Sequence, residues 1–132
     1  MSALLNNCTI LIPTRNRAAD LARTVRKLID IGLAHDKIIV LDDASDDPEA
    51  TGNALAGLKN VLFLKNTKRT GQAEGRNRLL KHATTKYCLC LDDDTYFLTL
   101  GDLPRLLEED SLDDQLGGLV FHTIRYYDGY SE

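Results

Sequence analysis

The stretch Lys37-Ile-Ile-Val-Leu-Asp-Asp43 places a short aliphatic run directly before two aspartates. A run of this length, rich in β-branched residues, predicts a buried β-strand. The same arrangement recurs at residues 87–91, where Tyr-Cys-Leu-Cys-Leu leads straight into Asp92, Asp93 and Asp94. The sequence therefore predicts two strands that each end in carboxylates.

Outward from these two strands, apolar runs and helical patterns alternate along the chain. Further strands are predicted at residues 8–13 and 61–64. Between the first two strands, aliphatic residues recur at helical spacing after a polar turn at residues 14–16, which is suited to cap the helix. Gly32 is expected to end this helix.

Three more helices and a last strand complete the pattern. Asp47 and Pro48 supply a capping carboxylate and a first-turn proline, so a helix is predicted to begin there. Helices are also predicted at about residues 72–83 and 103–109, and an apolar strand at residues 116–121.

The order of strands and helices decides the fold class. Strand–helix–strand units imply right-handed crossovers, so we expect an α/β fold with a mainly parallel sheet and helices on both faces, in one domain over residues 1–132. Ligands bind such sheets at the carboxyl ends of the strands. Residues 14–15, 42–43 and 92–94 are therefore predicted to converge on one edge and form a site.

Composition excludes several classes of protein. The net charge of -4 argues against a general nucleic-acid binder, whose surface would need to be positive. No window is long enough to span a bilayer and the N-terminus lacks a signal-peptide pattern, so we expect a cytoplasmic protein. The three cysteines form no CxxC pair, and Cys88 and Cys90 are expected to be buried, unreactive thiols on one face of a strand.

Three successive carboxylates after a buried strand repel one another unless a positive charge lies among them. A divalent cation is the usual compensation, and Mg²⁺ or Mn²⁺ takes carboxylate oxygens together with substrate phosphates. The alternative is an acidic loop that is simply solvated. Because Asp92, Asp93 and Asp94 directly follow an apolar strand, the sequence favours a metal site.

Asp42 and Asp43 share this strand-end position, and we expect one of them to accept a hydrogen bond from a base or a ribose. The alternative is a capped turn before the next helix. That interpretation has more weight for Asp46 and Asp47, which are expected to be solvated neighbours.

Basic residues surround the loop that precedes the helix predicted at residues 72–83. A helix N-terminus with arginines nearby is a natural diphosphate site. Arg69 and Arg76 are the candidates for this role. Arg78 and Lys81 are expected to lie on a solvated helix face.

Four segments of the chain resemble the inverting family 2 glycosyltransferases of the GT-A fold. The family pattern begins with Pro-Thr-x-Asn after the first strand and Asp-Asp-x-Ser-x-Asp after the second, similar to residues 13–16 and 42–47. A glycine before Arg-Asn on a helix follows, similar to residues 71–77, and then a run close to Leu-Asp-x-Asp-Asp, similar to residues 91–94. The resemblance covers about residues 8–97, in the family's order.

The resemblance implies a Rossmann-like half of the GT-A fold that binds a nucleoside-diphosphate sugar, typically with uridine as the nucleoside. It implies that Asp94, with Asp92, holds Mn²⁺ or Mg²⁺, which would neutralise the departing diphosphate. It also implies nucleotide-binding roles for Pro13, Thr14, Arg15, Asp42, Asp43, Arg69, Arg76, Asp92 and Asp93.

The family's catalytic base and acceptor site lie in a second half of the fold. We therefore expect this chain to be the donor-binding half, with the base and the acceptor unassigned. A half-domain is expected to leave an apolar edge that could pair with another copy of the chain. The loop before Gly71 is also longer than the family's Asn-x-Gly.

Two other functions compete with glycosyl transfer. A module that binds a nucleotide sugar or a metal without turnover would carry the same signatures. A phosphoacceptor receiver domain also places acidic residues at strand ends. In a receiver, however, the acidic pair follows the first strand, whereas here it follows the second.

Overall fold

The computed structural model describes residues 7–33, 37–108, 115, 117–121, 126–127 and 130–131 of the 132-residue chain. Its centre is a four-stranded sheet in the order β3-β2-β1-β4. Every pair of neighbouring strands in this sheet is parallel, which confirms the predicted α/β class. The strands are β1 (Cys8–Thr14), β2 (Lys37–Asp42), β3 (Val61–Lys65) and β4 (Tyr87–Cys90).

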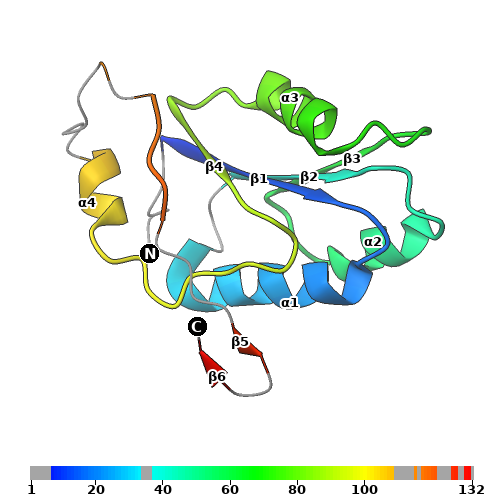
Figure 1. Ribbon diagram of the computed structural model, residues 1–132, viewed down its shortest axis with the longest axis horizontal. Helices are drawn as coiled ribbons and strands as arrows, with labels where there is room; N and C mark the ends of the chain where they lie inside the picture. The colour runs from blue at the N-terminus through cyan, green and yellow to red at the C-terminus, as the bar shows by residue number, and fades with distance from the viewer. Residues whose placement is uncertain are drawn as a thin grey trace.

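Helices cover both faces of the sheet, as predicted (Figure 1). α1 (Ala18–Leu28) and α2 (Pro48–Ala54) lie on one face, and α3 (Gln72–His82) lies on the other. Alternation along β1 explains the two layers: Ile10 and Ile12 pack into the core on the α1 side. Leu11 points the other way and joins Leu79 of α3 in a smaller core.

Glycine allows α3 to lie close to the sheet. Gly75 is buried, and a Cβ at this position would lie 3.4 Å from Leu41 Cδ2 on β2. A larger side chain would push the helix outward. The N-terminus of α3 is thus held close to the carboxyl ends of β1 and β2.

The helix ends follow the predicted signals in part. Asp47 Oδ1 accepts a hydrogen bond from Ala50 N over 3.1 Å at the start of α2, which confirms the predicted cap. Gly32, with a non-helical φ of 104°, lies inside a π-helical turn, η1 (Ile29–Leu33), that follows the end of α1 at Leu28. The predicted cap of α1 at residues 14–16 is wrong, because the capping position is Arg17 and its side chain makes no capping bond.

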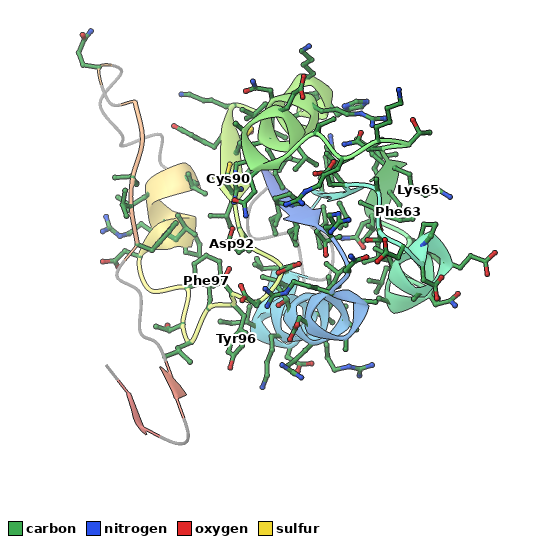
Figure 2. All side chains as sticks on the ribbon, turned by 45° about the vertical axis from the view of Figure 1, so that its right-hand side comes forward. Phe63, Lys65, Cys90, Asp92, Tyr96 and Phe97 are labelled. Carbon is green, nitrogen blue, oxygen red and sulfur yellow. The ribbon has the colours of Figure 1, made fainter. Side chains whose placement is uncertain are left out.

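The segment after β4 turns toward a short helix, α4 (Leu103–Glu108), which confirms the helix predicted near residues 103–109. Lys27 Nζ of α1 lies 5.7 Å from the centre of the Tyr96 ring. The neighbouring Phe97 packs against the core that contains Leu103 and Leu107 (Figure 2). These contacts fix the course of the chain immediately after the acidic run.

The strand predicted at residues 116–121 is wrong for the part of it that is described, residues 117–121, which form no strand. Val120 is 99% exposed, and Phe121 instead packs edge-to-face on Phe97 with ring centres 5.4 Å apart. Apolar content alone therefore did not make a strand of residues 117–121. Leu116 lies outside the described residues. A small antiparallel pair, β5 (Tyr126–Tyr127) with β6 (Tyr130–Ser131), follows.

The prediction that Cys88 and Cys90 are buried is wrong: both are exposed, whereas Cys8 is buried. The two thiols do share a face, because Cys88 pairs with Thr9 and Cys90 pairs with Leu11. That is the face that α3 covers over β1 and β2. β4 is the edge strand next to β1, and among the described residues no helix covers its part of this face. Burial raises the pKa of the Cys88 thiol, and the neighbouring Cys90 raises it further.

None of the helices formed by the described residues is long and apolar enough to cross a membrane.

Candidate functional site

A pocket of about 280 Å³ opens at the carboxyl edge of the sheet. Its walls come from the ends of β1 and β2, the segment after β4 and the first turn of α3, which confirms the predicted convergence of strand ends. The predicted site residues all line it except Asp42 and Arg76. The lining residues are Pro13, Thr14, Arg15, Arg17, Asp43, Arg69, Gly71, Gln72, Gly75, Asp92, Asp93 and Asp94.

The middle carboxylate of the acidic run is bound to the end of β1. Thr14 Oγ1 donates a hydrogen bond to Asp93 Oδ2 over 2.8 Å, and Thr24 Oγ1 of α1 donates to the Asp93 carbonyl over 2.7 Å. Burial raises the pKa of Asp93 above its ordinary value, although the Thr14 hydrogen bond and the Arg17 charge oppose this rise. Asp93 therefore anchors the run, while its neighbours face the solvent.

Arg17 lies between three carboxylates. Its Nε is 3.3 Å from Asp93 Oδ1 and 3.4 Å from Asp20 Oδ2, and its Nη2 is 2.8 Å from Asp94 Oδ2. The charges of Asp93 above all, then those of Asp94 and Asp20, raise the pKa of Arg17 despite the opposing effect of burial. Arg17 is not among the site residues predicted from the sequence.

A second arginine pairs with the acidic run. Arg76 Nη2 of α3 lies 2.6 Å from Asp92 Oδ1 (Asp92 is labelled in Figure 2). Within the described part of the chain, Arg76 Nη1 and Arg15 Nε are buried without a hydrogen-bond partner. Unpaired buried donors are costly, so both nitrogens are suited to an acceptor that the protein itself does not supply.

These ion pairs change the charge argument for a metal. The positive charge that Asp92, Asp93 and Asp94 require is already present as Arg17 and Arg76. In the described ranges, no group of three or more His, Cys, Asp or Glu side chains has the geometry of a metal site. Asp92 and Asp94 nevertheless offer partly exposed carboxylate oxygens, with side chains 56% and 46% exposed, and such oxygens are ligands that Mg²⁺ and Mn²⁺ prefer.

Asp43 organises the loop in front of α3. Its Oδ1 accepts from Asn66 Nδ2 and Thr70 N over 2.8 Å each, and from Thr70 Oγ1 over 3.1 Å. Its Oδ2 accepts from Gly71 N over 2.9 Å, at the start of the helix. Burial acts to raise the pKa of Asp43, but these hydrogen bonds outweigh it and hold the pKa below its ordinary value.

Asp42 lies behind Asp43 and does not line the pocket. It is 1% exposed, and its Oδ1 accepts from Ser45 N over 2.7 Å. Among the described residues its Oδ2 has no hydrogen-bond partner. Of the two adjacent aspartates, only Asp43 is therefore placed to touch a ligand in this pocket.

Asn16 links the loop that follows β1 to the loop that follows β2. The backbone N of Asn16 donates to Ser45 Oγ over 2.8 Å, and the side-chain Oδ1 of Asn16 accepts from Asp46 N over 2.8 Å. Both Asn16 and Ala44 have positive φ, 55° and 58°. Asp46, which was expected to be merely solvated, also uses its side chain in this link: Asp46 Oδ2 accepts a hydrogen bond from Asn16 Nδ2 over 3.2 Å. An asparagine after a strand-end proline was the available signal, because asparagine tolerates positive φ.

Arg78 is not on a solvated face, which corrects the expectation for this residue. It is half-buried, and its Nη1 donates to the Lys65 carbonyl over 3.1 Å and to Asn66 Oδ1. Arg78 therefore supports the Asn66 side chain that binds Asp43. Lys81 is exposed, as expected.

Two solved structures share this fold. The mannosyltransferase PcManGT from Pyrobaculum calidifontis, in complex with GDP-Man and Mn²⁺, superposes with a TM-score of 0.65 at 22% identity over 77% of this chain. TarS of S. aureus superposes with a TM-score of 0.66 at 21% identity over 78% of this chain. The alignments cover 31% and 32% of those chains, so this chain spans about a third of their length. At such identities the likeness establishes the GT-A fold alone.

Sequence comparison gives the family. No curated protein sequence matches the chain. The family profile described as "Glycosyl transferase family 2" matches residues 9–129, a range that contains every strand of the parallel sheet except the first residue of β1, together with the whole pocket. The chain belongs to glycosyl transferase family 2.

Proposed function

We propose that this chain binds a nucleoside-diphosphate sugar in the pocket at the carboxyl edge of the sheet, as the donor-binding part of a metal-assisted glycosyltransferase. The observation that carries the proposal is the meeting of three kinds of group in one cavity: the Asp92–Asp94 run, the arginines, and the N-terminus of α3. Family membership supports the same conclusion.

The pocket divides by chemistry. Pro13 and Arg15 form an apolar and cationic wall that suits a nucleobase and ribose, with Asp43 beside them. Arg69 and Gly71 lie at the start of α3, where the helix dipole and backbone N–H groups favour a diphosphate. The buried, unpartnered Nε of Arg15 is available to an acceptor on the ligand.

Asp94, together with Asp92, would hold the divalent cation. When bound, Mg²⁺ or Mn²⁺ supplies Lewis-acid stabilisation of the departing diphosphate. Asp93 is the anchor of the run through Thr14 and would not act as a ligand. Mn²⁺ accompanies GDP-Man in the PcManGT structure, so we propose Mn²⁺ as the first metal to test and guanosine beside uridine as the nucleoside.

Calorimetric titration tests the proposal directly. Uridine diphosphate and guanosine diphosphate are titrated into the full chain with Mn²⁺, with Mg²⁺ and with a chelator. One of the two nucleotides should bind with metal and lose most of its affinity with the chelator. Failure of both nucleotides under every metal condition would contradict the proposed function.

A matched pair of variants assigns the metal. Asp94→Ala should abolish the metal-dependent part of the binding. Asp102→Ala makes the same change at a carboxylate that is 79% exposed, pairs with Arg105 at 3.8 Å and does not line the pocket, and it should bind as the unmodified chain does. The release of nucleotide from a nucleotide sugar is then measured with the same proteins. Release indicates a transferase, whereas binding without release indicates a module that only binds.

A further inference from the structure

Arg17 pairs with Asp94, the carboxylate that is proposed to hold the cation. Its Nη2 bonds Asp94 Oδ2 over 2.8 Å, and its side chain lines the same pocket as the acidic run. We propose that Arg17 exchanges partners: it neutralises Asp94 in the empty site and turns its terminal nitrogens to the donor diphosphate when Asp94 takes up a divalent cation. This inference rests on the proposed function.

The two ends of the guanidinium contact carboxylates that differ in burial. Its Nε faces Asp93 at 3.3 Å and Asp20 at 3.4 Å, and the Asp93 side chain is only 9% exposed. A buried carboxylate needs its positive partner, so this contact persists whatever the site binds. The Nη2 end can turn while Nε stays in place.

The contact with Asp94 is easily broken. Both side chains of the pair are 46% exposed, and an ion pair so open to water contributes little to stability. A cation on Asp94 also repels the guanidinium at this short range, since two positive charges cannot share one carboxylate oxygen at low cost. The displaced nitrogens then need an acceptor, and the oxygens of a diphosphate are strong ones.

The exchange predicts coupling between the two ligands. Without nucleotide, Arg17 competes with the cation and weakens its binding. With nucleotide, Arg17 binds the diphosphate and no longer competes. Each ligand therefore raises the affinity for the other by the same factor.

The critical measurement is the binding of Mn²⁺ alone to the full chain. The electron paramagnetic resonance signal of the free Mn²⁺ ion reports how much of the metal is bound. In Arg17→Gln the affinity for Mn²⁺ without nucleotide should rise by about fivefold, near the lower end of ordinary coupling factors. The affinity for the nucleotide at saturating Mn²⁺ should fall by about the same factor, so that the coupling between the ligands disappears.

Two further variants make the result specific. Arg23→Gln removes a charge from the same helix, where Arg23 pairs with Asp20 at 3.3 Å and its side chain is 65% exposed, and it should leave both affinities unchanged. Arg17→Lys keeps the positive charge and should bind Mn²⁺ alone much as the unmodified chain does, even if Arg17→Gln folds poorly.

The outcomes separate this inference from the proposed function. If the nucleotide binds with Mn²⁺ but Arg17→Gln binds Mn²⁺ alone no more tightly, the exchange is wrong and the donor site stands. Equal tightening in Arg17→Lys or in Arg23→Gln overturns it as well. If no nucleotide binds to the unmodified chain, the proposed function itself fails and the exchange fails with it.

Discussion

Thr14 and Asp93, 79 residues apart, are joined by a hydrogen bond of 2.8 Å from the threonine hydroxyl to the buried carboxylate. The bond ties the end of β1 to the segment that follows β4. It holds the centre of the acidic run in place and so sets where Asp92 and Asp94 stand in the pocket.

Replacement of Thr14 by valine removes the hydroxyl and keeps the shape of the side chain. We expect Thr14→Val to lower the free energy of unfolding by about 1–3 kcal/mol, because a buried carboxylate loses a donor. The variant should also bind the donor nucleotide more weakly, since the acidic run loses its anchor. Urea unfolding and nucleotide titration measure the two effects.

Thr9→Val is the matched control at the other end of the same strand. Thr9 is buried and its hydroxyl lies 2.7 Å from Thr85 Oγ1, so this variant should also lose stability. Its nucleotide affinity should not change. Equal weakening of nucleotide binding in the two variants would show that the effect is general loss of structure.

Asp43 and Asp93 should respond to pH in opposite directions. Hydrogen bonds hold the pKa of Asp43 low against the effect of burial, so its ionised form stabilises the fold at neutral pH, and this contribution is lost as the pH falls through its folded pKa. Burial raises the pKa of Asp93, so its ionisation costs stability as the pH rises above the ordinary carboxyl value of about 4.

Unfolding of Asp43→Asn and Asp93→Asn at several pH values tests this contrast. The free energy of unfolding of Asp43→Asn should fall furthest below that of the unmodified chain near neutral pH, and the difference should become smaller in acid. The stability of Asp93→Asn relative to that of the unmodified chain should increase as the pH rises. Parallel profiles for the two variants would contradict the assignment.

Two adjacent leucines of α3 test the smaller core. Leu79 is fully buried against Leu11, Ile39 and Leu41, whereas Leu80 is 44% exposed. Leu79→Ala should lower the free energy of unfolding by about 2–5 kcal/mol. Leu80→Ala should change it by less than about 0.5 kcal/mol. Similar losses would mean that α3 packs in another orientation.

The thiols should react in two classes. In the folded protein, Cys88 and Cys90 should be modified by a small thiol reagent, whereas Cys8 should react only on unfolding. The raised pKa of Cys88 should slow its reaction at neutral pH relative to that of an ordinary exposed thiol. Peptide mapping after timed labelling measures each rate, and early modification of Cys8 would count against the buried position of β1.

Much of the fold follows from local sequence. The parallel strands end within a residue or so of their predicted limits because aliphatic runs stop abruptly at polar residues. The carboxylates after β2 and β4 meet at one edge because parallel strands direct their carboxyl ends the same way. Local sequence was sufficient for this part of the site.

The missed features depend on residues far apart in the chain. Arg17 belongs to the site through Asp94, 77 residues away, and Asn66 belongs to it through Asp43. Cys88 is exposed because α3 covers β1 and β2 but not the outer strand. Topology decides which strand lies at the edge of the sheet and which face a helix covers. The local sequence of the residues concerned does not reveal either.

The position of β1 between β2 and β4 has a consequence for synthesis of the protein. One edge of β1 pairs with β2, but its other edge must wait for β4, whose residues follow their partners in β1 by about 79 positions, as Tyr87 follows Cys8. On a ribosome adding about 5–20 residues per second, that delay is roughly 4–16 s. Through this interval the open strand edge of the nascent chain is free to pair wrongly, and the pocket cannot form until β4 and the acidic run have been synthesised.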